Sequence, residues 1–247
     1  MPNLAERKNY TCKLDRAVSL SDQTKHLEFH APEMERFDFV PGQFVSLLAP
    51  KDGRVITRAY SIASSPRKNQ FDVCLNRVEN GFFSNLLCDM SEGAELKFHG
   101  PHGLFVLRNP LRDAMFIATG TGIAPMRAFV EWLFADQSRH AGRNIWLVFG
   151  TRYTKDIYYR DEFERVAQRH PNFHYLITLS RAGDEWEGER GYVQEHIRKI
   201  LEARPAELRK DMDAYICGLN DMVSACRKLL MEEFGWDKKQ VIFERYD

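Results

Sequence analysis

The stretch AMFIATGTGIAP, residues 114–125, joins an apolar run to a glycine turn and the start of a helix. Ala114–Thr119 predicts a buried strand, and Pro125 suits the first turn of a helix over Pro125–Ala135, where its missing N–H costs no hydrogen bond. Between them, Gly120 and Gly122 allow a backbone to approach a pyrophosphate, and the helix N-terminus offers free N–H groups with a partial positive charge. This order favours a dinucleotide-binding module, although a tight β–α connection without a ligand has the same pattern.

Downstream of this stretch, apolar runs alternate with helical patterns. In the pattern Gly191–Ala203, for example, Val193, Ile197 and Leu201 lie on one helical face. Such alternation predicts a five-stranded parallel sheet with helices on both sides. The further strands are expected at Asn144–Gly150, Phe173–Ser180, Ala214–Cys217 and Val241–Glu244, and the further helices at Arg160–Arg169 and Asp221–Phe234.

Upstream of residue 110, the chain has a different character. Six short β-rich runs are separated by turn residues such as Pro41-Gly42 and Asp52-Gly53, which is typical of an antiparallel sandwich or small barrel. One short helix fits at Phe82–Cys88, and Arg108-Asn109-Pro110 is the expected hinge to the second half. The six runs are Tyr10–Leu20, Thr24–Ala31, Gln43–Ala49, Arg58–Ala63, Phe71–Val78 and Glu95–His99.

Composition excludes several classes of protein. Lys+Arg and Asp+Glu are both 35, and this balance argues against nucleic acid as the main partner. The longest stretch without a charged residue has 13 residues, Ala114–Met126, shorter than the roughly 20 of a membrane helix. The N-terminal residues lack the apolar core of a signal peptide, so a soluble, cytoplasmic chain is expected. Five cysteines without a C-x-x-C pair argue against a disulfide framework, a zinc site or an iron–sulfur cluster.

A second motif, RAYSIASSP, covers residues 58–66 of the β-rich half. The planar fork of Arg58 suits a phosphate, the ring of Tyr60 can stack on a flat heterocycle, and the hydroxyl of Ser61 can donate and accept hydrogen bonds. The same residues also fit an ordinary strand with alternating faces. Elsewhere, the acidic segment Asp184–Glu189 is interpreted as an exposed loop.

With these motifs in this order, the chain resembles the ferredoxin–NADP reductase superfamily from about Tyr10 to Tyr246. Arg58-x-Tyr60-Ser61 matches the family's flavin signature, and Gly120–Pro125 matches its nicotinamide-domain signature. Three further matches are Gly81–Asn85, Gly100–Phe105 (with His102 at a usual aromatic position) and Cys217-Gly218. Glu244-Arg245-Tyr246 resembles the family's acid-x-aromatic terminus, here followed by Asp247.

The resemblance implies a two-domain α+β fold. A six-stranded antiparallel Greek-key β-barrel over residues 1–107 binds FAD, and an α/β domain with a five-stranded parallel sheet over residues 108–247 binds NADP. Ser61, Cys217 and Glu244 are the implied catalytic residues, with Ser61 near the flavin N5 and the other two bounding the nicotinamide pocket. The implied FAD-site residues are Arg58, Tyr60, Ser61, Leu75, Arg77, Gly81, Phe83, Ser84, Thr121 (between the two cofactors) and Tyr246.

Nucleotide choice depends on the residues that follow two strands. NADPH carries a 2′-phosphate, which calls for arginine or serine nearby. In NADP-dependent members of the family, the positions of Thr151-Arg152, Ser180-Arg181 and Arg190 hold the adenosine phosphate. The resemblance therefore favours NADPH over NADH, although a solvated arginine face has the same sequence. The implied NADP-site residues are Gly120, Thr121, Gly122, Thr151, Arg152, Ser180, Arg181, Arg190 and Gly218.

The function implied by the resemblance is a ferredoxin(flavodoxin)–NADP reductase. It exchanges hydride between NADPH and FAD, and single electrons between the flavin and ferredoxin or flavodoxin. The alternatives are a reductase component of an oxygenase, a free-flavin reductase, and a non-catalytic subunit or nucleotide sensor of a larger complex. No nucleic-acid, membrane or metal partner is expected, and a monomer is favoured.

Overall fold

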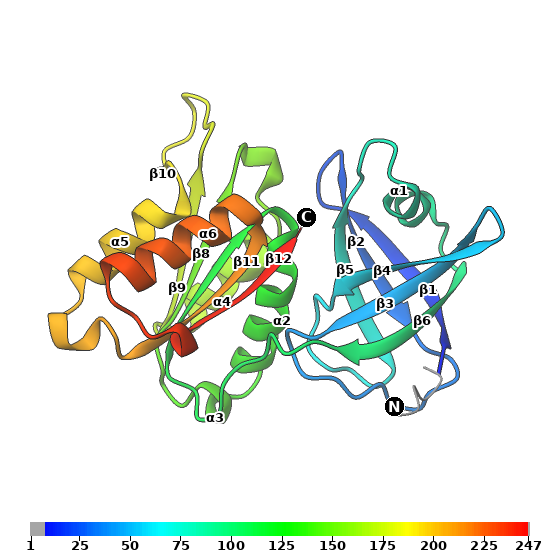
Figure 1. Cartoon of the computed structure of the whole chain (residues 1–247), viewed down its shortest axis with the longest axis horizontal. Coiled ribbons are helices and arrows are strands. Elements are labelled where there is room, and N and C mark those ends of the chain that lie inside the picture. The colour runs from blue at the N-terminus through cyan, green and yellow to red at the C-terminus, as the bar shows by residue number, and fades with distance from the viewer. Residues whose placement is uncertain (1–7, 247) are drawn as a thin grey trace. The chain divides into compact units, whose positions relative to one another are not determined.

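The computed structural model describes residues 8–246, which form two compact units (Figure 1). The first unit ends at Val106 and the second begins at Leu107.

The first unit is a six-stranded antiparallel sheet, here called sheet A. Its strand order is β4-β3-β6-β1-β2-β5, so strands that are neighbours in the sheet are often distant in the chain, as in a Greek key. The bridge between Ile62 and Val73 joins the two outer strands, which confirms the predicted Greek-key barrel. The strands are β1 (Tyr10–Ser19), β2 (Thr24–His30), β3 (Phe44–Lys51), β4 (Arg54–Ser61), β5 (Gln70–Asn76) and β6 (Glu95–His102).

Local sequence explains the barrel. β3 and β4 form a hairpin whose turn residues Asp52 and Gly53 have φ of 50° and 74°, as the tight turns that suit twisted strands require. Alternate side chains of the strands enter one aromatic core, in which the rings of Phe71 and Phe98 have centroids 5.1 Å apart. The short helix α1 (Phe82–Asp89) adds buried side chains to the same core.

The second unit contains a parallel sheet, here called sheet B, with strand order β10-β9-β8-β7-β11-β12 (Figure 1). Its strands are β7 (Asp113–Thr119), β8 (Ile145–Thr151), β9 (Phe173–Leu179), β10 (Glu189–Arg190), β11 (Met212–Leu219) and β12 (Val241–Tyr246). Its α-helices are α2 (Ile123–Phe134), α3 (Gln137–His140), α4 (Arg160–Arg169), α5 (Val193–Ala203) and α6 (Asn220–Lys228). α6 continues into a π-helical turn at Leu229–Glu233, and 3₁₀ turns lie at Gly120–Gly122, Thr154–Asp156, Ala206–Leu208 and Lys238–Gln240.

Helices cover both faces of sheet B, as the alternating pattern predicts. On β7, Met115 and Ile117 join a buried cluster with side chains of α5 and α6. Phe116 points to the other face, where its ring centroid lies 5.2 Å from that of Phe129 on α2. None of the helices in the described range is long and apolar enough to cross a membrane.

The predicted five-stranded count for sheet B is wrong by one strand. The additional strand, β10, has only two residues and pairs in parallel with Thr178 and Leu179 of β9. Both of its residues are charged and exposed, so no apolar periodicity marks them in the sequence.

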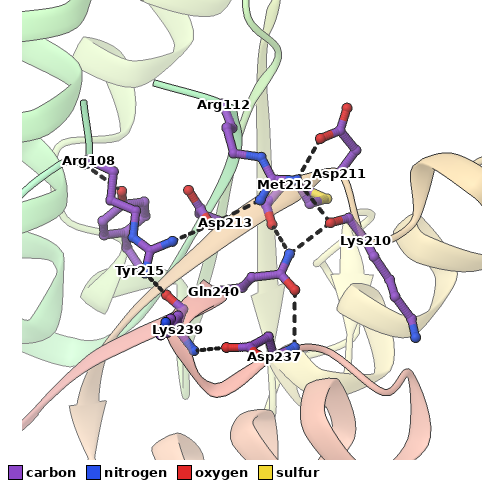
Figure 2. A network of polar contacts seen from close by, with 10 residues as sticks. All are labelled: Arg108, Arg112, Lys210, Asp211, Met212, Asp213, Tyr215, Asp237, Lys239 and Gln240. Carbon is purple, nitrogen blue, oxygen red and sulfur yellow. Dashed lines mark hydrogen bonds and ion pairs between the residues drawn. The ribbon is translucent and has the colours of Figure 1, made fainter. Parts of the chain in front are cut away.

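The segment that leads into the second unit is bound to the amino-terminal edge of sheet B (Figure 2). The Arg108 guanidinium contacts the carboxylate of Asp213 at 3.3 Å, and its backbone N–H donates to the Tyr215 hydroxyl at 2.9 Å. Arg112 binds Asp211 at 2.5 Å and lies 3.6 Å from Asp213. Asp213 itself is almost completely buried, so this network concentrates charge at the point where the chain enters the sheet.

Candidate functional site

In the first unit, the flavin signature lies on β4, an outer strand of sheet A. β4 pairs with β3 along its whole length, and directly after β4 the chain forms a bridge from Ile62 to Val73 of β5. Arg58 is exposed on this strand, and its Nη1 donates to the Thr57 carbonyl at 2.9 Å, which leaves the rest of the guanidinium fork accessible within the described structure. A phosphate-binding arginine needs this accessibility.

Tyr60 and Ser61 end the same strand. The Tyr60 ring is half-buried, with its centroid 6.1 Å from that of Phe83, and burial raises the pKa of Tyr60 to about 12. The phenol is therefore neutral at ordinary pH and can present an apolar face to a flat ring. Ser61 is buried at the strand end.

The second flavin segment is a close turn before α1. A Cβ at Gly81 would lie 2.7 Å from the Ser84 Oγ and 2.9 Å from the Val78 Cβ, so only glycine fits there. Ser84 Oγ accepts from the Val78 N–H at 3.0 Å, and Asn85 Nδ2 donates to the carbonyls of Val78 and Gly81. These bonds shape the turn, while α1 starts without a side-chain cap and without an acidic residue in its first turn.

Such a turn fits the pyrophosphate of FAD, because the first N–H groups of a helix bind anions. The structure limits how three of the predicted FAD-site residues can contact the cofactor. Leu75 and Phe83 are buried in the barrel core, so only their backbone can reach a ligand. Arg77 is held by Asp89 at 2.5 Å and Asn85 at 2.7 Å, and it braces α1.

In the second unit, the glycine turn between β7 and α2 packs directly on β11. A Cβ at Gly122 would lie 2.2 Å from the Cys217 carbonyl oxygen and 2.9 Å from the Gly218 Cα. Gly218 is constrained in the same way as Gly122, because a Cβ at Gly218 would lie 2.4 Å from the Thr119 Oγ1. The two predicted motifs, Gly120–Pro125 and Cys217-Gly218, are therefore one contiguous site, although they lie about 95 residues apart in the sequence.

This turn also has the features of a dinucleotide cradle. Gly120 adopts φ of 55°, and α2 begins with no side-chain cap and no acidic residue in its first turn. The Thr119 Oγ1 is buried and makes no hydrogen bond within the described structure. A buried polar atom without a partner is rare, so a hydroxyl at this place is suited to a polar ligand group. The arrangement fits a nicotinamide dinucleotide, with Thr121 next to the glycines.

Cys217 and Glu244 are neighbours across the β11–β12 ladder. Burial raises the pKa of the Cys217 thiol well above its ordinary value, and the nearby Glu244 carboxylate raises it further, against a smaller opposite effect of a hydrogen bond with Tyr246. The thiol is thus neutral, which argues against a nucleophilic cysteine and favours a small neutral boundary of the pocket. Glu244 and Tyr246 are half-buried on β12, the outer strand.

The predicted phosphate-binding residues gather at the carboxyl ends of β8 and β9. Backbone bonds from Ser180 to Thr151 (2.9 Å) and from Arg181 to Arg152 (3.1 Å) hold the two strand ends side by side. Arg152, Ser180 and Arg181 are all exposed. The fifth residue, Arg190, is engaged differently: its guanidinium donates to the carbonyls of Ala182, Gly183 and Trp186 at 2.7–3.2 Å.

Two aromatic residues at this edge were not predicted. The Tyr153 hydroxyl forms a hydrogen bond with Arg181, which raises the pKa of that guanidinium, and Tyr192 lies near enough to add to the effect. Both tyrosines are well exposed, so their rings are accessible to a flat ligand. Their positions directly after Thr151-Arg152 and Gly191 were the available signal. Among the described residues, no group of three or more His, Cys, Asp or Glu is arranged to hold a metal ion.

Comparisons with known proteins match each unit to a family of cofactor-binding domains. The family described as an oxidoreductase FAD-binding domain matches residues 11–107, and that described as an oxidoreductase NAD-binding domain matches residues 116–228. Ferredoxin–NADP reductase B of Sorangium cellulosum is 41% identical over 232 residues, covering 92% of this chain and 93% of that protein. The glycine betaine monooxygenase reductase subunit of Pseudomonas aeruginosa is 36% identical over 214 residues, covering 85% of this chain but only 56% of that protein.

Solved structures agree at the level of the fold. A ferredoxin–NADP⁺ reductase from Plasmodium falciparum with 2′P-AMP superposes with a TM-score of 0.81 at 23% identity, covering 98% of this chain and 99% of that one. The Amycolatopsis cytochrome P450 reductase GcoB gives 0.84 at 23% identity, covering 96% and 69%.

The barrel with its flavin signature and the sheet with its dinucleotide cradle define an oxidoreductase that binds FAD and a nicotinamide nucleotide. The chain belongs to the ferredoxin–NADP reductase superfamily.

Proposed function

We propose that this chain is a ferredoxin(flavodoxin)–NADP reductase, which moves electrons between NADPH and a small one-electron carrier protein. The observation that carries the proposal is the polar cluster of Arg152, Ser180 and Arg181 at the carboxyl edge of sheet B. Two arginines and a serine at this edge suit a 2′-phosphate, the group that distinguishes NADPH from NADH. The 41% identity to a ferredoxin–NADP reductase over 93% of its length supports the same choice.

Each predicted residue has a proposed task. Arg58 binds FAD phosphate, the turn at Gly81 receives the pyrophosphate, and Tyr60 covers the ring. Bound flavin supplies the ability to accept two electrons together and release them singly. Ser61 orients the reacting end of the flavin, while Cys217 and Glu244 bound the nicotinamide site.

At the adenosine end, Arg181 is the principal phosphate ligand. The neighbouring Tyr153 side chain raises the pKa of this guanidinium, so Arg181 presents a full positive charge to the phosphate. Tyr153 and Tyr192 offer rings for the adenine. Arg190 contributes indirectly, because its guanidinium already donates hydrogen bonds to carbonyls of the 182–186 segment.

The experiment compares kcat/KM for NADPH and NADH in the wild type and in Arg181→Ala, with ferricyanide as the electron acceptor. Removal of one charge-assisted bond to the phosphate is expected to lower NADPH preference about tenfold, with NADH turnover unchanged. Arg169→Ala is the matched control, since Arg169 is an exposed arginine at the far end of α4 from this edge. A wild-type protein that prefers NADH would overturn the assignment.

A reductase component of an oxygenase is the second candidate. It is favoured by the 36% identity to the glycine betaine monooxygenase reductase subunit, of which this chain spans about half. Stopped-flow oxidation of the NADPH-reduced protein by ferredoxin, flavodoxin and oxygenase components from the same cell separates the two. A colourless protein inert towards both nucleotides would instead point to a non-catalytic subunit. A monomeric state and a cytoplasmic location stay predictions.

A further inference from the structure

A groove of about 530 Å³ lies along the outer edge of sheet B, between α4, β9 and the 182–189 segment. It exists because β10 pairs only with Thr178 and Leu179, which leaves the edge of β9 at Tyr175–Ile177 without a strand beside it in the described structure. The proposed NADPH residues stand beyond the carboxyl end of β9, whereas the groove follows the middle of this strand. The groove is therefore outside the assigned cofactor sites.

One wall of the groove is the indole of Trp186, and several contacts fix its position. Its Nε1 donates to the Glu189 carbonyl at 2.9 Å. A Cβ at Gly188 would lie 2.4 Å from the Trp186 ring, so glycine is needed for the ring to lie across the chain. The three carbonyl contacts of Arg190 tie down the same segment. The ring is thus held over the groove by the loop itself, before any ligand is present.

The rim of the groove is acidic on two sides. Glu164 projects from α4 and Glu189 from β10, and both side chains are about half exposed. In the described structure Glu164 uses Oε1 to bind Arg160 at 2.7 Å, and Glu189 uses Oε2 to contact Lys199 and His196 at 3.4 Å. No hydrogen bond of the described structure uses the other oxygen of either carboxylate. The loop adds further negative charge at Asp184, Glu185 and Glu187.

One cationic side chain of the protein, that of Arg160, already lies beside Trp186 and Glu164. The Arg160 guanidinium lies 5.8 Å from the Trp186 ring centroid while it is paired with Glu164. A positive group over an indole face next to a carboxylate is stabilised by both. Ala167 and Ile177 also line the groove, together with Tyr175 and Leu176, so the groove combines a cation-binding rim with apolar surface for a hydrocarbon body.

We propose that this groove binds a small organic cation, an ammonium or guanidinium group carried on an apolar body. The charged group lies between Trp186 and the carboxylates of Glu164 and Glu189, and the body lies against the apolar lining at Ala167 and Ile177. The volume is within the range of small-molecule sites, about 300–1,000 Å³. Arg160 competes with the ligand for the same wall, so its removal strengthens binding.

The test is an NMR titration of the FAD-bound protein, observing the indole N–H of Trp186, which Trp186→Phe assigns among the four tryptophans. The probes are phenethylammonium and its neutral counterpart, phenethyl alcohol. Phenethylammonium should shift the Trp186 indole resonance to saturation, with an affinity that falls as the salt concentration rises. Phenethyl alcohol should give no saturable shift. Glu189→Gln and Glu164→Gln should each raise Kd about threefold, and Arg160→Ala should lower it by a similar factor.

The matched control is Glu202→Gln, which removes an exposed carboxylate of α5 outside the groove and should leave Kd unchanged. Equal shifts with the charged and neutral probes would overturn the proposal, as would a Kd unaffected by either groove substitution. NADPH turnover does not enter this readout, so the result is independent of the proposed function.

Discussion

Replacing Gly122 by alanine tests whether the contact between the glycine turn and β11 builds the nicotinamide site. The new Cβ would stand 2.2 Å from the Cys217 oxygen and 2.6 Å from the Cys217 carbonyl carbon, whereas real Cβ atoms essentially never come within 3.0 Å of another atom. Both obstructing atoms belong to the backbone of a central strand. The turn or β11 must therefore move by about 0.8 Å, because no side chain can rotate out of the way.

The expected losses of stability and of catalytic activity follow from this displacement. Overpacking of this kind costs about 1–3 kcal/mol, which in a protein of this size lowers Tm by about 2–12 °C. A shift approaching 1 Å in a substrate-positioning element can reduce catalysis about 10²-fold. We expect kcat/KM for NADPH to fall by that order while the FAD content stays equal to the wild type, because the flavin residues proposed on the barrel are unaffected.

The assay combines thermal melting, NADPH–ferricyanide turnover and the ratio of flavin to protein absorbance. Gly142→Ala is the control: Gly142 has φ of 72° with nothing within 4 Å of a built Cβ, so alanine adds backbone strain of about 1 kcal/mol but no collision. A Gly122→Ala protein with wild-type Tm and kcat/KM would refute the reasoning. Loss of activity in Gly142→Ala to the same degree would show that lower stability alone explains the result.

Three further predictions concern other parts of the chain. Asp213→Ala should lower the free energy of unfolding by about 1–3 kcal/mol in denaturant titrations, less than for a fully buried pair because Arg108 can be rehydrated; an unchanged midpoint would contradict this. Ser61→Ala should slow NADPH-driven flavin reduction about 10²-fold in stopped flow with FAD retained, and a wild-type rate would leave the serine structural. Burial lowers the pKa of His140 below 6.5, so the unfolded state takes up the proton first and stability falls as pH drops below about 6.5. Urea midpoints at pH 7.5 and 5.5 should differ less in His140→Asn, and an equal difference would show that His140 does not contribute.

Local sequence was sufficient for most of the fold. The strand–glycine–helix order at residues 114–125 and the alternation that follows it predicted sheet B with its helices, because periodicity and glycine conformation are properties of neighbouring residues. The hairpin turn at Asp52-Gly53 followed from the same kind of signal, and the structure gives both residues positive φ. The family's motifs then indicated which cofactors the two units bind.

Other features needed the tertiary structure, because they depend on where distant segments meet. β10 forms only because two charged residues reach the edge of β9, and no periodicity marks them. The sequence shows an arginine at position 190 but not that its guanidinium is engaged by three carbonyls of its own loop. The groove beside Trp186 likewise arises from α4, β9 and a loop that are separate in the chain.

The sequence by itself therefore determined the order of the two units, the type of each sheet and the residues that carry the cofactor motifs. The tertiary structure alone decided which of those residues are accessible, since exposure and hydrogen bonding depend on the whole fold. The contact of Gly122 with Cys217 shows the difference. Each residue is recognisable in its own motif, but the requirement for glycine at position 122 comes from the backbone of a strand about 95 residues further along the chain.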